Sequence, residues 1–329
     1  MASVSTVDYH TAGEPFRIVS GGVRPLRGRT ILEKRRDALE GLDDVRRLLV
    51  CEPRGHADMY GCFVTEPEDE GADLGVVFFH NEGFSTACGH GTIALVTWAL
   101  ETGVLPAPDS GEARVVVDVP SGRLSCVAVC RAGRVESVRF RNVPSFVLAT
   151  GLRVGDVTLD LAYGGAFYGS LDVAEVGLRV RAADLPRLIA LQRELRPAIE
   201  AALEVVHPLE PELEGVYGIV FYEEEPGGPE LRQRNVTVFA DGEVDRSPCG
   251  SGTSARLALL HASGRIGVGE PLRHLSIVDT EFVGRVVETT DVAGLPAVVT
   301  EVEGAAYLTG RHEFVLADGD PLGTGFLLR

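Results

Sequence analysis

Two cysteines lie in nearly identical short motifs, and their surroundings make them the residues best suited to chemistry. Cys88 belongs to the motif Cys-Gly-His-Gly-Thr, and Cys249 belongs to Cys-Gly-Ser-Gly-Thr. Each motif leads into an apolar stretch, 93–100 or 255–260, and a glycine follows fifteen residues after each cysteine. A glycine just past an apolar periodic run is typical of a helix C-terminus. The pattern therefore predicts two equivalent helices, each with a cysteine at its first turn.

The start of a helix gives a cysteine chemical significance. The first backbone N–H groups have no partner within the helix, and together with the helix dipole they favour negative charge. A thiol in such a place can have a pKa of roughly 3.5–7.5. The glycines beside each cysteine would let a ligand approach the backbone closely. One such site indicates a nucleophile or a base, and two matched sites indicate a reaction on two faces of a substrate.

The composition predicts a globular protein. The chain has 329 residues, 45% of them hydrophobic and 24% charged, which suggests about two domains. Its net charge of -17 disfavours nucleic acid or an anionic membrane as a partner. We find neither a membrane-spanning stretch nor a signal peptide. Six cysteines in a chain of this length do not form a disulfide scaffold, so we expect a reduced, cytoplasmic protein.

Lysine and cysteine usage disfavours several kinds of site. Lys34 is the only lysine and lies in a charged run, where we expect it to be solvated or structural. Because pyridoxal phosphate enzymes need a Schiff-base lysine, that class is improbable. There is no Cys-x-x-Cys pair, and no metal site is predicted. The remaining cysteines are expected to be small buried hydrophobic residues: Cys51, Cys62, Cys126 and Cys130.

The motifs also fit two other classes of protein, a dinucleotide-binding protein and a hydrolase. Both motifs fit a Gly-x-Gly-x-x-Ala dinucleotide fingerprint, but that fingerprint should follow directly from a hydrophobic strand, and here polar turn residues intervene. A Cys–His hydrolase stays open because four histidines could act as its base: His10, His56, His80 and His90. The hydrolase would leave the second cysteine motif without a role.

The order of expected elements repeats once along the chain. Short strands and a helix over 31–49 precede the first cysteine helix, and strands and a helix over 183–203 precede the second. The sequence therefore predicts two similar α+β halves, 1–149 carrying Cys88 and 150–329 carrying Cys249. We expect the two cysteine helices to begin at a shared cleft.

Five segments together resemble the proline racemase family: 8–15, 52–61, 85–91, 142–146 and 245–250. This family includes proline racemase, 4-hydroxyproline 2-epimerase and trans-3-hydroxy-L-proline dehydratase, and the resemblance covers nearly the whole chain. It implies a fold similar to diaminopimelate epimerase, with two pseudo-symmetric halves that are each a barrel-like sheet around a central helix. In that fold the final strand, here about 310–329, can cross back to the first half.

The same resemblance implies a reaction without a cofactor on a small-molecule substrate, proline or a hydroxyproline, in a protein that is commonly a homodimer. One of Cys88 and Cys249 would remove the Cα proton as a thiolate, and the other would protonate the opposite face as a thiol. Such a pair titrates as a unit.

The resemblance also implies which residues bind the substrate. Side chains of His90 and Asp245 would hold the substrate nitrogen, and Tyr60 and Phe239 would line the ring pocket. Backbone N–H groups at the two helix starts would bind the carboxylate and stabilise the charge that develops on it as the proton leaves: Gly89, His90, Gly250 and Ser251.

The residue at position 249 bears on the type of reaction. In the family's 3-hydroxyproline dehydratases, threonine usually replaces this cysteine. Inversion needs acid–base groups on both faces, so Cys88 with Cys249 favours a racemase or epimerase acting at C2 of proline or 4-hydroxyproline. Two alternatives remain. One is dehydration of trans-3-hydroxy-L-proline, which the dehydratase-like segments 80–86, 163–168 and 239–241 favour, and the other is a non-catalytic amino-acid-binding protein.

Overall fold

The computed structural model describes residues 3–328, and the chain divides into two compact units. The first unit runs to Val138 and includes the segment from Ala305 onward, and the second is Arg139–Gly304. The division lies before the expected boundary at 149 because β8 (Ser145–Val154) pairs with β9 (Val157–Tyr163) inside the second unit. Both units are of the α+β class.

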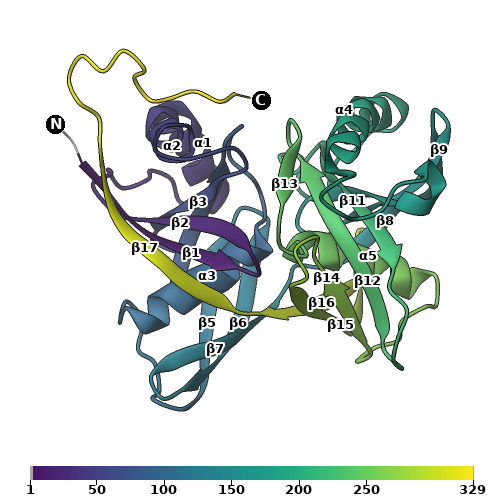
Figure 1. Ribbon diagram of the computed structural model, residues 1–329. Helices are drawn as coiled ribbons and strands as arrows, with labels where there is room; N and C mark the ends of the chain where they lie inside the picture. Colours follow the sequence, from purple (N-terminus) through teal and green to yellow (C-terminus); the bar gives the residue numbers. More distant parts are fainter. Residues whose placement is uncertain (1–2, 329) are drawn as a thin grey trace. The chain divides into compact units, whose positions relative to one another are not determined.

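The first unit is built on a sheet that combines the N-terminal strands with a strand from the end of the chain. β17 begins at residue 306, earlier than the expected 310, and pairs antiparallel with β1 along its length (Figure 1). β2 pairs parallel with β3, and β4 pairs parallel with β5. The strands are β1 (Ser3–Thr11), β2 (Glu14–Gly21), β3 (Tyr60–Thr65), β4 (Leu74–His80), β5 (Gly111–Val119), β6 (Gly122–Arg131), β7 (Arg134–Arg141), which continues past Val138, and β17 (Ala306–Val315).

The central helix of the first unit is α3 (Gly89–Glu101). Every residue from Gly89 to Leu100 is buried, and the helix packs on β1, β2, β3, β6 and β17. A helix that is apolar on all sides is stable only when it is enclosed, which explains why the sheet curves around it. None of the described helices has the length and apolar character needed to cross a membrane.

The expected helix over 31–49 is two helices, α1 (Ile31–Gly41) and α2 (Asp43–Val50). Thr30 and Glu33 form a capping box at the start of α1, and the backbone at Leu42 departs from helical geometry and separates the two. Lys34 is buried, so of the two expected roles, solvated or structural, it has the structural one. Its ammonium group donates to the carbonyl of Glu66 at 2.5 Å and has a structural role.

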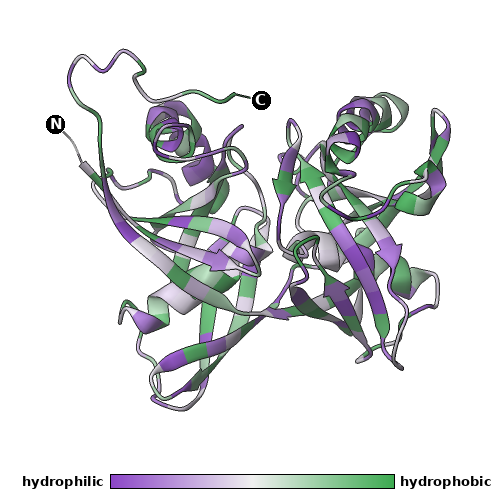
Figure 2. Ribbon diagram, in the orientation of Figure 1, coloured by the Kyte–Doolittle hydropathy of each residue, from purple (hydrophilic) through white to green (hydrophobic). Residues whose placement is uncertain are grey.

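The second unit repeats this plan around α5 (Gly250–Ala262). Gly250–Leu260 are all buried, and α5 packs on β8, β9, β10, β15 and β16. α4 (Leu185–Ala202) packs on β8, β11 and β12, and Figure 2 shows hydrophilic and hydrophobic residues on it, as expected for a helix with one solvated face. The other elements are β10 (Phe167–Asp172), η1 (Val173–Val176), β11 (Val216–Glu224), β12 (Leu231–Phe239), β13 (Glu243–Asp245), β14 (Pro271–Leu275), β15 (Glu281–Val292) and β16 (Leu295–Gly304).

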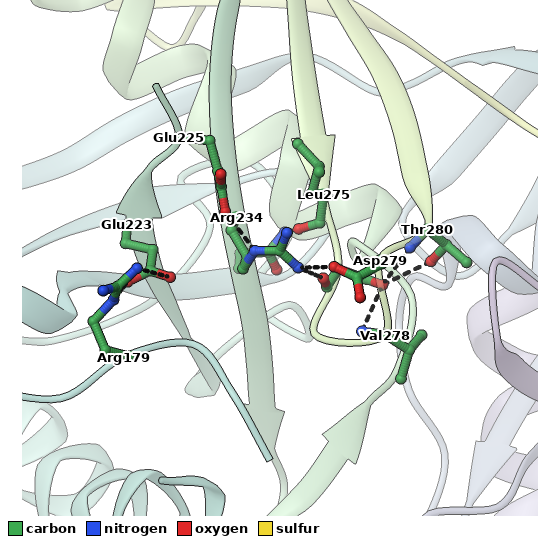
Figure 3. Close-up of polar contacts among 10 residues, drawn as sticks. Arg179, Glu223, Glu225, Arg234, Leu275, Val278, Asp279 and Thr280 are labelled. Carbon is green, nitrogen blue, oxygen red and sulfur yellow. Dashed lines mark hydrogen bonds and ion pairs between the residues drawn. The ribbon is translucent and has the colours of Figure 1, made fainter. Parts of the chain in front are cut away.

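Ion pairs hold the acidic segment at the end of β11. Arg179 donates to Glu223 at 2.5 Å, and Arg234 donates to Glu225 at 2.5 Å and to Asp279 at 2.7 Å (Figure 3). These arginines tie two neighbouring loops to β11 and β12, so the acidic residues have partners that sequence alone did not indicate.

Candidate active site

Cys88 is the N-cap residue of α3, as the sequence predicts. Its backbone is extended (φ -156°, ψ 97°), and the Gly91 N–H donates to its sulfur at 3.3 Å. The ring nitrogens of His90 lie 3.5 and 3.6 Å from the same sulfur. The helix start therefore places a thiol, a backbone donor and an imidazole within contact of one another.

The His90 imidazole is in its neutral form at neutral pH. Burial lowers the pKa of His90 to about 3. The rings of Phe16 and Tyr60 pack edge-to-face against it, and their centroids lie 5.6 and 5.0 Å from the centroid of the imidazole. The Tyr60 hydroxyl donates to Ser85 Oγ, which fixes that ring. A neutral imidazole can donate one hydrogen bond and accept another without bringing a positive charge into the site.

Cys249 is the N-cap residue of α5 and repeats this geometry with one difference. The Gly252 N–H donates to its sulfur at 3.4 Å, as Gly91 does for Cys88. Its backbone, however, has φ 62° and ψ 105°. A residue with a Cβ is strained at positive φ, and such strain gathers at functional sites. The fold therefore holds this thiol with a strained backbone, whereas Cys88 is relaxed.

Burial decides the protonation state of Cys249. Burial, together with the smaller effect of the negative charge of Asp245, raises the pKa of this thiol to about 12. The Gly252 N–H and the hydroxyls of Thr237 and Tyr168 oppose the increase without cancelling it. The low thiol pKa expected at a helix start is therefore wrong for Cys249, because desolvation outweighs the N–H groups. In this structure Cys249 is a protonated thiol, which is a proton donor.

Two hydroxyl groups occupy the place beside Cys249 that the imidazole occupies beside Cys88. Ser251, two residues after Cys249, lies 2.6 Å from the Tyr168 hydroxyl. The Cys249 thiol donates to Tyr168 Oη at 3.9 Å. Sequence reasoning missed Tyr168 as a site residue, although it ends the glycine-rich segment 163–168 noted for its dehydratase-like pattern.

The short hairpin of β12 and β13 carries Phe239 and Asp245 and places them near the start of α5. Phe239 pairs with Glu243 in that hairpin, and its ring stacks on Tyr217 with 5.2 Å between centroids. The Asp245 carboxylate accepts from the Ser247 N–H at 2.8 Å, and burial raises the pKa of Asp245 to about 6. The carboxylate is thus buried next to the cysteine motif.

The predicted site residues fall into two groups, one in each unit. Around Cys88 the structure gathers Tyr60, Gly89 and His90, and around Cys249 it gathers Phe239, Asp245, Gly250 and Ser251. Within residues 3–328 no three His, Cys, Asp or Glu side chains are grouped so as to hold a metal ion. Each group is a half-site for acid–base chemistry, with a thiol at the start of a buried helix.

Comparison with known proteins agrees with an acid–base enzyme of this architecture. A family model described as proline racemase matches residues 6–327, and the chain belongs to the proline racemase family. The chain is 46% identical over 332 residues to a 3-hydroxyproline 2-epimerase of Burkholderia multivorans, with 99% of this chain and 98% of the relative covered. It is 45% identical over 328 residues to a trans-3-hydroxy-L-proline dehydratase of Bacillus cereus, with 98% of each covered.

A solved structure supports the fold independently. The crystal structure of a hydroxyproline epimerase from Agrobacterium vitis, with bound trans-4-hydroxy-L-proline, matches with a TM-score of 0.92 and 32% identity. The match covers 99% of this chain and 96% of that one. The protein is therefore an enzyme of the racemase and epimerase type with the fold expected from the resemblance.

Proposed function

We propose that the enzyme inverts C2 of proline or a hydroxyproline, with Cys88 and Cys249 as its acid–base pair and no cofactor. One observation carries the proposal: the same half-site is built twice. In each, a cysteine sulfur caps a largely buried helix and accepts from the N–H three residues later, at 3.3 and 3.4 Å. Two proton-transfer groups are what inversion requires and elimination does not.

In the proposed mechanism one sulfur removes the Cα proton as a thiolate while the other donates a proton to the opposite face. The protonated state of Cys249 suits the donor role in the direction in which Cys88 is the base. The roles exchange in the reverse direction, so the pair titrates as a unit. The mechanism requires that both sulfurs reach one substrate.

The remaining residues would orient the substrate and stabilise the charge that develops. The first N–H groups of α3 and α5, at Gly89 and Gly250, would bind the carboxylate, whose negative charge grows as the proton leaves. The Asp245 carboxylate would pair with the substrate ammonium. Such a pairing offsets the cost of its burial, because an opposite charge favours the ionised carboxylate. His90, being neutral, would accept a hydrogen bond from the same nitrogen.

Dehydration of trans-3-hydroxy-L-proline is the second candidate, and the named dehydratase relatives favour it. Elimination would use one cysteine as the base that removes the Cα proton while the C3 hydroxyl leaves. A relative named 3-hydroxyproline 2-epimerase is equally similar, so 3-hydroxyproline belongs among the inversion substrates as well as proline and 4-hydroxyproline.

Proton NMR of the products distinguishes the two candidates. Reduced enzyme would be incubated in deuterated water with L-proline, trans-4-hydroxy-L-proline and trans-3-hydroxy-L-proline in turn. We expect the Cα proton signal to disappear while the C2 stereoisomer forms. For proline, the optical rotation should fall as the Cα proton is lost. A cyclic imine formed from the 3-hydroxy compound, with no stereoisomer from any of the three, would overturn the proposal. Sedimentation of the same sample would test the homodimer that the family suggests.

A further inference from the structure

Arg256 is a buried cation without a carboxylate partner. It lies on α5, seven residues after Cys249, and is 3% exposed. Its Nε donates to Gln233 Oε1 at 2.9 Å, and its guanidinium stacks 3.6 Å above the ring of Tyr222. Among residues 3–328 no Asp or Glu forms an ion pair with it. Arg179 and Arg234, in the same unit, are both paired with carboxylates (Figure 3).

The isolation of this guanidinium carries an energetic cost. A buried charge is costly unless it is paired and hydrogen-bonded. Arginine presents five N–H donors. Nε donates to Gln233, and a further hydrogen bond joins Arg256 to the Tyr222 side chain, so the terminal amino groups still have donors to offer. Burial lowers the pKa of Arg256, and the nearby charge of Arg265 lowers it as well, whereas Tyr222 and the carboxylate of Glu224 oppose that change in part. The fold therefore tolerates an under-compensated cation at this position.

Arg256 lines an open pocket with a volume of about 470 Å³. That volume is within the range of roughly 300–1,000 Å³ that is usual for small-molecule sites. Arg265 lines the same pocket and donates from one amino group to Glu224 at 3.0 Å, which leaves its other donors available. Asp160 is the one carboxylate of the wall, and its Oδ1 accepts from the Gly151 N–H. Tyr222 forms the apolar side.

We propose that this pocket binds a small molecule through an oxyanion group, a carboxylate or a phosphate, held by the amino groups of Arg256. The planar guanidinium fork matches either group in a two-bond geometry, and it is already oriented by Gln233 and Tyr222. Arg265 adds a second cation to the wall. The site is separate from the cysteine motif and does not depend on the reaction proposed above.

A titration observed at Arg256 itself tests the proposal. Acetate and inorganic phosphate would each be added to the ¹⁵N-labelled protein while the Nε–H resonances of arginine are recorded. The Arg256 signal is assigned by its disappearance in Arg256→Gln, or by its contact with Gln233 if that variant does not fold. We expect a saturable shift of this signal with at least one anion. Saturation by acetate alone would assign a carboxylate ligand, and saturation by phosphate alone would assign a phosphate ligand.

Two variants separate specific binding from general charge effects. Arg265→Gln changes a half-exposed residue of the pocket and should weaken binding by about tenfold, the usual effect of losing a hydrogen bond to a charged group. Arg234→Gln removes an equal charge from the paired cluster of Figure 3 and should leave the affinity unchanged. The absence of a saturable shift with either anion, or equal weakening by both variants, would overturn the proposal.

Discussion

The strained backbone at Cys249 predicts an unusual order of stability for its glycine and alanine variants, and the same variants of Cys88 serve as the control. With φ 62° and ψ 105°, Cys249 holds its Cβ in a region that costs about 1–3 kcal/mol for a residue other than glycine. Cys249→Ala keeps the Cβ and the strain, whereas Cys249→Gly removes both. Glycine also loses more chain entropy on folding, which costs about 0.5–1 kcal/mol. We therefore expect Cys249→Gly to be more stable than Cys249→Ala by about 1 kcal/mol.

The same pair of substitutions at Cys88 should give the opposite order. Cys88 has φ -156°, where a Cβ is not strained, so only the entropy cost of glycine acts. Cys88→Gly should be less stable than Cys88→Ala by about 0.5–1 kcal/mol. The glycine-minus-alanine difference in the free energy of unfolding is compared between the two sites. The comparison isolates the strain, because all four variants lose a buried sulfur at a helix start. We expect the two differences to be about 1–3 kcal/mol apart.

Thermal unfolding of the four variants is the assay. In domains of this size, 1 kcal/mol shifts the midpoint by about 2–4 °C. Chemical denaturation of the same samples would give the free energies of unfolding for comparison. An equal glycine-minus-alanine difference at both cysteines would refute the claim that the fold strains Cys249.

Three further predictions concern groups around the two sulfurs. Gly91→Ala would place a Cβ 2.4 Å from the ring of Phe16 and 2.7 Å from the sulfur of Cys88, so we expect unfolding measurements to show a loss of about 1–3 kcal/mol, accompanied by slower inversion. Tyr168→Phe removes one buried hydroxyl and should cost about 1 kcal/mol of stability and reduce the inversion rate, whereas an unchanged rate would remove Tyr168 from the site. Burial raises the pKa of Asp245 from 3.8 to about 6, so between these pH values the folded state binds more protons than the unfolded state and stability falls as pH rises. Asp245→Asn should therefore be more stable than the parent at pH 8 and equal to it near pH 4 in denaturation experiments, and a gap that did not depend on pH would contradict this cause.

The helix starts were predictable from sequence because their signals are local. A cysteine among glycines, an apolar run and a glycine fifteen residues later define each element without knowledge of the rest of the fold. The break between α1 and α2 was missed because it depends on backbone geometry at Leu42, a residue whose type gives no stop signal. The pairing of β17 with β1 was anticipated only through the family resemblance, since partners so far apart in sequence leave no local pattern.

The electrostatics of the site were less predictable than its residues. The N–H groups at the helix start lower the pKa of Cys249, and this contribution could be predicted from sequence. Burial raises the pKa by more, and the extent of burial depends on the whole surrounding fold. Tyr168 contacts Ser251 across 83 positions of sequence, and no spacing rule identifies such a contact. The positive φ of Cys249 likewise follows from how the segment before α5 is held, and the sequence around it marks no such strain.

Inversion by single cysteine variants tests the two-base claim most directly. Cys88→Ser and Cys249→Ser would be compared with the parent and with Cys130→Ser, a buried cysteine of β6 that serves as the control. The readout is formation of the C2 stereoisomer carrying solvent deuterium, from whichever substrate the parent inverts. The account predicts that inversion is lost in both motif variants and retained in the control. Inversion at the parent rate in Cys249→Ser would contradict it.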